Sequence, residues 1–205
     1  GDVYKRQEFN NEVLRYLRQN KLENMISEAS SFRVIFTYMV EAIVNSLLYG
    51  LFIGILLITL IIGLFFRSYL LPALSIFPNI LPIGMGFGLW GLFVGDVGFM
   101  VAVGMGSTLG VIVDFTVHFL SKYELARKEF KKSVEESVIY SFETVGFALI
   151  IMTVVLALGF SVLNLVTFIP IQDFAKFSVI CFIGGLIINF LFLPNLLMKF
   201  DKRKF

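Results

Sequence analysis

The stretch that decides the fold is residues 46–66, SLLYGLFIGILLITLIIGLFF, which contains no charged residue. A helix rises about 1.5 Å per residue, so about 20 apolar residues cross the roughly 30 Å of hydrocarbon in a bilayer. Four further apolar runs meet this length requirement: 72–94, 98–121, 142–166 and 174–198. The sequence therefore predicts an all-α membrane protein with five transmembrane helices.

The composition excludes a soluble globular domain. Of 205 residues, 58% are apolar and 16% are charged, and the mean hydropathy is +0.87. Soluble domains have about 45–50% apolar and about 25% charged residues, so a domain of this size cannot bury the excess. The net charge is only +2 and no basic patch interleaved with aromatic residues occurs, which argues against nucleic acid as a partner. We expect membrane lipids to surround the chain.

The orientation follows from Lys and Arg in the short loops, because these residues stay on the cytoplasmic side. Ten of them follow the first, third and fifth spans: Arg67, Lys122, Arg127, Lys128, Lys131, Lys132, Lys199, Lys202, Arg203 and Lys204. The loops on the other side, 95–97 and 167–173, contain none. We predict a multi-pass protein of the cytoplasmic (inner) membrane whose C-terminus is cytoplasmic and whose N-terminal segment is extracytoplasmic.

This orientation has a consequence for residues 1–45, which are polar and contain six Lys or Arg. Nothing in them drives their own export, so an upstream segment must carry them across the membrane. We therefore expect this chain to be the C-terminal part of a longer membrane protein.

Two regions outside the spans have predicted structure of their own. Residues 1–39 are predicted to be the end of an extracytoplasmic α+β domain, with an apolar helical stripe over 8–29 and a strand at Phe32–Phe36. Residues 40–205 form the predicted transmembrane domain. Within it, apolar residues recur every four positions over 124–141, which predicts an amphipathic helix on the cytoplasmic surface. A helix packed on the ends of the spans fits this pattern equally well.

Asp114 is the one acidic residue deep in a predicted span. It lies seven residues, or roughly 10 Å, before the predicted cytoplasmic end at Ser121. His118 follows at i+4 on the same helix face, and Gly106 and Gly110 continue that face backwards. Glycines allow a neighbouring helix to approach closely, so we expect the ionisable pair to lie against a helix instead of lipid.

Such a pair predicts a proton relay. Intramembrane acids are rare and usually face a bundle interior or a water path, where a proton can be loaded and released. Asp114 has the alternative role of hydrogen-bonding a neighbouring helix, and His118 that of capping the inner end of its own helix. Thr153 in the fourth span is a candidate partner for Asp114, although a bond to its own helix backbone is the stronger expectation for it.

The second span carries a predicted kink at Pro78 and Pro82, where Asn79 could satisfy a freed carbonyl. No catalytic constellation occurs beside these features. The chain has one His, one Cys (Cys181) and no phosphate-binding loop, so no metal site, disulfide or cofactor is expected and we do not expect an enzyme.

Several motifs resemble the resistance–nodulation–division (RND) superfamily, and most closely its MMPL-type predicted exporters, which are kin to Patched and sterol-sensing proteins. Gly110-Val-Ile-Val-Asp114 resembles their Gly-x-x-x-Asp span, and Phe77-Pro-Asn-Ile-Leu-Pro82 resembles their Pro-Asn-x-x-Pro helix start. Phe66-Arg67-Ser68 and residues 167–174 resemble their Phe-Arg-Ser ending and their last outer loop. The resemblance covers about residues 32–199.

The resemblance implies five helices of one RND repeat after the end of a porter domain. It implies proton-driven export of hydrophobic, amphiphilic or lipid-like molecules, with Asp114 at the proton-carrying position. The N-terminal repeat of the same transporter is then an expected partner, and a homo-oligomer is a further possible assembly. Phe115 and the Thr-poor fourth span depart from the family pattern, which leaves a non-transporting lipid-sensing or scaffold protein of the same fold as the alternative.

Overall fold

The computed structural model of the chain describes residues 8–9, 11–13, 15–16, 19, 32–95 and 97–203. It divides into two compact units, residues 1–46 and 47–205. Of the predicted helical stripe over 8–29, the described residues are helical, and the rest of that stretch lies outside the described residues. The second unit holds the elements that matter for function.

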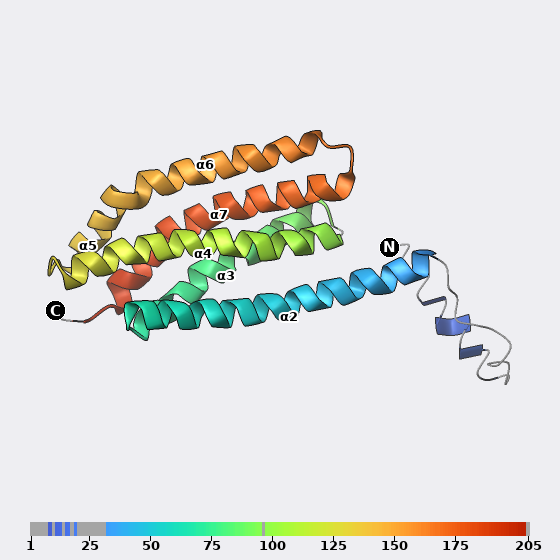
Figure 1. The fold of residues 1–205 in the computed structure, drawn as a ribbon, viewed down its shortest axis with the longest axis horizontal. Helices are drawn as coiled ribbons and strands as arrows, with labels where there is room; N and C mark the ends of the chain where they lie inside the picture. Colours follow the sequence, from blue (N-terminus) through green and yellow to red (C-terminus); the bar gives the residue numbers. More distant parts are fainter. Residues whose placement is uncertain are drawn as a thin grey trace. The chain divides into compact units, whose positions relative to one another are not determined.

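The described residues are almost entirely helical, and no strand is assigned among them. Five helical stretches are long and apolar enough to cross a membrane, so the chain is a multi-pass membrane protein. The elements, in chain order, are α2 Phe32–Phe66, α3 Leu70–Phe93, α4 Phe99–Lys128, α5 Val134–Ser141, the π-helix η2 Phe142–Gly146, α6 Phe147–Val162, the 3-10 turn η3 Leu163–Leu165 and α7 Ile169–Phe200 (Figure 1).

The predicted strand at Phe32–Phe36 is wrong, because α2 already begins at Phe32. The β-branched and aromatic residues there fit a half-buried sheet surface, but their preference is weak where no partner strand exists. Extending a helix that is already nucleated adds a hydrogen bond for each residue fixed. The long apolar helix that follows therefore determines the conformation of its own beginning, and the α+β remnant is not supported.

The predicted separate helix over 124–141 is also replaced by a different arrangement. Residues 124–128 are the last turn of α4, and the chain turns at Lys131, whose φ is +52°. Ser133 then starts α5 with a capping box, in which its hydroxyl accepts from the Glu136 amide at 3.2 Å. From there α5 runs through η2 into α6, so residues 134–141 begin the fourth spanning helix.

The core of the second unit lies around α7. Helices α3, α4 and α6 all pack against α7, as Figure 1 shows. More than half of the most apolar segment of α7, 56%, is buried, against 6% for α2. Helix α2 buries Ile62 and Phe66 in the core near its C-terminal end, while Leu51, Ile55 and Ile58 pack against the core partly buried. The bundle therefore buries α7 on several sides and leaves most of α2 exposed.

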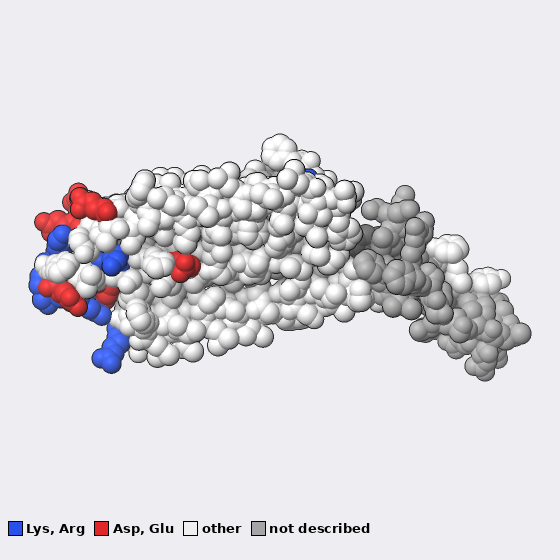
Figure 2. Space-filling view, turned by 45° about the horizontal axis from the view of Figure 1, so that its top comes forward, with Lys and Arg blue, Asp and Glu red and all other residues white. Residues whose placement is uncertain are grey.

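Charged side chains gather at one end of the bundle, as seen on the face in Figure 2. The turns after α2 and α4 and the end of α7 all lie there, joined by contacts among Phe66, Ser68, Lys128 and Arg203. We call this the charged end. In Figure 2, an acidic side chain also lies apart from it, within uncharged surface.

Candidate functional site

Asp114 occupies the middle of α4, 15 residues after Phe99 and 14 before Lys128. At the rise of an α-helix, this places it about 21–22 Å from each end. The middle of a spanning helix lies at the depth of the lipid acyl chains, so a residue there contacts hydrocarbon unless another helix or water covers it. Inserting Asp at such a position costs on the order of 2.5–3.5 kcal/mol, so its surroundings decide what it does.

The structure brings Asp114 and His118 together as predicted from their spacing. The His118 Nε2 atom lies 3.4 Å from Asp114 Oδ1, within ion-pair distance when the imidazole is protonated. The side chains are half exposed, 51% for Asp114 and 56% for His118. The pair therefore lies on an outer face of α4 and is not sealed in the core of this chain.

Gly106 and Gly110 lie on the same open face. A Cβ atom added to either glycine would meet no atom within 4 Å. Gly104, on another face of α4, contrasts with them, because a Cβ there would lie 3.1 Å from the Phe177 ring. The helix predicted to pack against Gly106 and Gly110 is therefore absent from the described part of this chain. We call the surface made by Gly106, Gly110, Asp114 and His118 the open face.

Thr153 does not meet Asp114. It is buried in α6, and its hydroxyl donates to the carbonyl of Leu149 at 2.8 Å. Within the described residues, no hydrogen bond joins it to the open face. Of the two roles considered for Thr153, the structure therefore has the bond to its own helix.

Pro78 and Pro82 are both buried inside α3, which continues through them. Asn79 is buried between them, and among the described residues no hydrogen bond joins it to a carbonyl freed by a proline. Its Oδ1 atom lies 2.6 Å from the hydroxyl oxygen of Thr116 on α4. Asn79 therefore joins two helices where the sequence predicted a local role.

Thr116 is the centre of a polar cluster that the sequence analysis missed. Its hydroxyl oxygen also lies 2.9 Å from Asn189 Oδ1 on α7, and Asn189 Nδ2 donates to the Gly185 carbonyl at 3.1 Å. All three side chains of the cluster are buried. The Thr116 hydroxyl has one proton and can donate to only one of the two amide oxygens. It accepts from the other side-chain amide when the oxygen and nitrogen of that amide are exchanged. The cluster holds α3, α4 and α7 together at Thr116, which is two residues from Asp114 along α4.

A second polar group, the ion cluster, lies at the charged end and consists of Glu124, Arg127, Lys128, Asp201 and Arg203. Arg203 donates to both carboxylate oxygens of Glu124, at 3.0 and 2.9 Å, and to both of Asp201, at 2.9 and 2.8 Å. Arg127 also donates to the Arg203 carbonyl. The basic C-terminal stretch is therefore held against the end of α4.

The ion cluster changes how Asp201 titrates. Burial alone would raise the pKa of Asp201, but hydrogen bonds from Arg203 and Tyr123 outweigh it and lower the pKa to about 2. The same carboxylates stabilise the charged form of Arg203 and raise its pKa against the effect of burial. Asp201 and Arg203 therefore stay charged near neutral pH, and we interpret the ion cluster as structural.

The described residues contain no group of three His, Cys, Asp or Glu side chains that could hold a metal ion. The site is thus an acid–imidazole pair and two glycines on an uncovered helix face. No protein-family model matches the chain, and no curated protein matches its sequence.

Proposed function

We propose that this chain is part of an exporter of hydrophobic or lipid-like molecules, driven by the proton-motive force across the cytoplasmic membrane. The observation that carries the proposal is the half-exposed Asp114–His118 pair in the middle of a spanning helix. The resemblance of residues 110–114 and 77–82 to RND motifs supports it further. In this proposal the charged end faces the cytoplasm, in agreement with the positive-inside rule.

The open face requires a cover. An ionised carboxylate in contact with acyl chains is unfavourable, and Gly106 and Gly110 leave room for a helix to approach. We infer that the N-terminal repeat of the same transporter, or a second copy of this chain, packs on this face. Such a cover would place Asp114 in an interface between helices, where water and protons have a path.

The pair has the chemistry that a proton relay needs. Asp114 binds a proton when the interface opens to one side of the membrane and releases it when the interface opens to the other. His118, one helical turn nearer the charged end, can pass that proton on through its Nε2 atom. A proton moving through the full potential gains about 2.3 kcal/mol per 100 mV, enough to bias a conformational change of a few kcal/mol.

A second candidate is a non-transporting lipid-sensing or scaffold protein of the same fold. The observation that favours it is the lack of further proton-binding groups around Asp114 among the residues that the structure describes. Phe115 is buried and carries no exchangeable proton, and the Thr153 hydroxyl is bound to its own helix. In this case the open face would bind a partner without transferring protons.

The deciding experiment compares Asp114→Asn with Glu143→Gln in the full-length protein reconstituted in vesicles. Glu143 is an exposed acid in η2, away from the open face, so its variant controls for the loss of one negative charge. We expect Asp114→Asn to abolish proton-coupled export and Glu143→Gln to retain it. Unchanged proton-coupled export by Asp114→Asn, with normal membrane insertion, would reject Asp114 as the proton carrier, whereas a wild type that exports nothing would leave the second candidate.

A further inference from the structure

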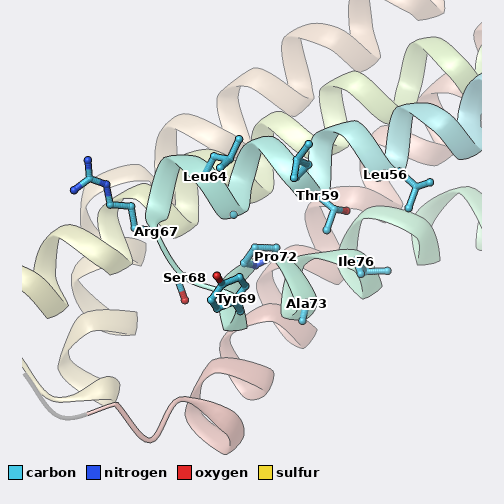
Figure 3. A pocket seen from close by; sticks show the side chains of 11 residues that line it. Leu56, Thr59, Leu64, Arg67, Ser68, Tyr69, Pro72, Ala73 and Ile76 are labelled. Atoms are coloured by element: carbon cyan, nitrogen blue, oxygen red, sulfur yellow. The ribbon is translucent and has the colours of Figure 1, made fainter.

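A groove of about 730 Å³ lies between α2 and α3, away from the open face of α4. Figure 3 shows its extent, with Arg67, Ser68 and Tyr69 in the turn at one end and Leu56 and Ile76 towards the other. The α2 side chains that line the groove, among them Leu56, Leu60 and Leu64, are exposed, whereas Ile62 and Phe66 on a neighbouring face of the same helix pack into the core. It opens on the outer surface of the bundle.

The groove has the length of one membrane leaflet. Its wall runs along α2 from Leu56 to Arg67, the residue after the helix, and these 11 steps at the helical rise span about 16 Å. Half of a roughly 30 Å hydrocarbon core is about 15 Å. Between these ends the lining is apolar apart from Thr59, whose hydroxyl already donates to the Ile55 carbonyl at 2.7 Å. The body of the groove is therefore suited to an acyl chain.

The end of the groove is built differently. Arg67, the residue after α2, has a φ of +49°, and the Ser68 amide donates back to the Gly63 carbonyl at 3.3 Å. A left-handed conformation costs a non-glycine residue roughly 1–2 kcal/mol, and Gly or Asn is usual at this position of a helix end. Tyr69 beside it is 99% exposed, as expected of an aromatic ring at headgroup depth. The end of the groove thus has an arginine in an unfavourable backbone conformation and a fully exposed tyrosine beside it.

The charges around this turn attract an anion. The Arg67 guanidinium extends outward from the turn, and no salt bridge to it is found among the described residues (Figure 3). Lys128 donates to the Phe66 carbonyl at 2.9 Å, which places the ion cluster directly beside it. Three cations and two carboxylates leave that cluster at +1, and Arg67 raises the local charge to +2.

We propose that the groove binds one acyl chain of an anionic phospholipid from the leaflet at the charged end, with its phosphate against Arg67. The length and apolar lining of the groove select a lipid chain, and the local positive charge selects an anionic headgroup. The proposal rests on α2, α3 and the ion cluster, so it holds whether or not Asp114 carries protons.

Native mass spectrometry of the purified full-length protein in detergent tests this directly. The probes are 1-palmitoyl-2-oleoyl phosphatidylglycerol and the phosphatidylcholine with the same chains. The wild type should bind the anionic lipid about fivefold more tightly, because a basic residue near an anionic headgroup contributes about 1 kcal/mol. Arg67→Gln should remove this preference. Lys131→Gln should retain it, since Lys131 is an exposed cation at the same end with the same left-handed conformation, away from the groove.

Two further variants separate the chain-binding groove from the fold. Ala73 is exposed in the groove wall, so Ala73→Trp should fill the groove and weaken both lipids, whereas Ala148→Trp on the outside of α6 should weaken neither. Arg67→Gly should keep the thermal stability in lipid-free detergent while losing the preference, since glycine adopts the same φ without strain.

Equal binding of the two lipids by the wild type would overturn the proposal, as would an unchanged preference in Arg67→Gln. So would Ala73→Trp that binds both lipids normally. If Ala73→Trp instead dissociates a dimer, the groove is occupied by a second copy and the lipid assignment is wrong.

Discussion

Two faces of α4 carry glycine, and the two sets of glycines lie in opposite surroundings. On the closed face, a Cβ added to Gly104 would lie 3.1 Å from the Phe177 ring of α7, so that ring would have to shift. On the open face, Gly106 and Gly110 have no atom within 4 Å of an added Cβ. Glycine on α4 thus allows close packing against α7 on one face, whereas on the other face it borders space that no neighbouring helix of the described chain fills.

The ionisable groups make this difference informative. The closed face buries Thr116 within a cluster of amides, whereas the open face displays Asp114 and His118. Burying polar groups with partners is tolerable, but leaving a carboxylate against lipid is costly. The closed face therefore maintains the fold of this chain, and in our proposal the open face is an interface for another helix.

The largest expected effect comes from breaking the closed face. A Cβ at Gly185 on α7 would lie 2.9 Å from Ile112 Cγ1 and 3.6 Å from the Phe115 ring. Gly185→Val should lower the free energy of unfolding by about 3 kcal/mol, because overpacking a tight core forces the helices apart. Thermal unfolding in detergent measures this. Gly159→Val on the outside of α6 is the matched control, since a Cβ at Gly159 meets nothing within 4 Å; equal losses in both variants would mean that helix propensity, not packing, is responsible.

A somewhat smaller effect should follow from removing the hydroxyl at the centre of the buried polar cluster. Thr116→Val leaves the amides of Asn79 and Asn189 without their shared partner. Leaving buried polar groups unsatisfied costs about 1–3 kcal/mol, so we expect a loss of about 2 kcal/mol in unfolding free energy. Thr153→Val serves as the control, because that hydroxyl bonds only its own helix. If both substitutions cost the same, the cluster does not hold the helices together.

The five spanning helices could be predicted because runs of about 20 apolar residues have only one stable form in lipid. The start of α2 could not, because Phe32–Phe36 taken alone resembles a strand and only the attached helix decides otherwise. The start of α5 was readable in principle. Ser133 followed by Glu136 is a capping-box pattern, and it places a helix start within the stretch 124–141 that is predicted as a single helix.

The candidate site likewise has residues that could be predicted from local spacing and residues that only the tertiary packing brings together. Asp114 and His118 could be paired from their four-residue spacing, which local helix geometry fixes. Thr116, Asn79 and Asn189 come from three helices, 37 and 73 residues apart along the chain, and no local pattern joins them. Spacing also gave no means of telling the open glycines from the buried ones, because that depends on which neighbouring helix lies where.

A change of pH should test the ion cluster with an effect of at most about 2 kcal/mol. The pKa of Asp201 is about 2 in the folded chain, below its ordinary value of 3.8. A depressed pKa contributes stability that is present above the unfolded value and lost as the pH falls through the folded one. Unfolding free energy should therefore decline between about pH 4 and pH 2, and Asp201→Asn should flatten that decline. An unchanged decline in Asp201→Asn would show that other carboxylates cause it.

The smallest effect on folding should come from filling the open face. Gly110→Leu adds a large side chain at a position where an added Cβ meets nothing within 4 Å beyond its own helix backbone, and Leu is favoured over Gly in a helix by up to about 1 kcal/mol. Thermal unfolding of the purified chain in detergent should therefore stay unchanged or rise slightly. The same side chain would occupy the space left for a covering helix, so proton-coupled export by the full-length protein should fall. A loss of stability as large as that of Gly185→Val would mean that the two faces of α4 do not differ, because a residue in open space cannot strain the core.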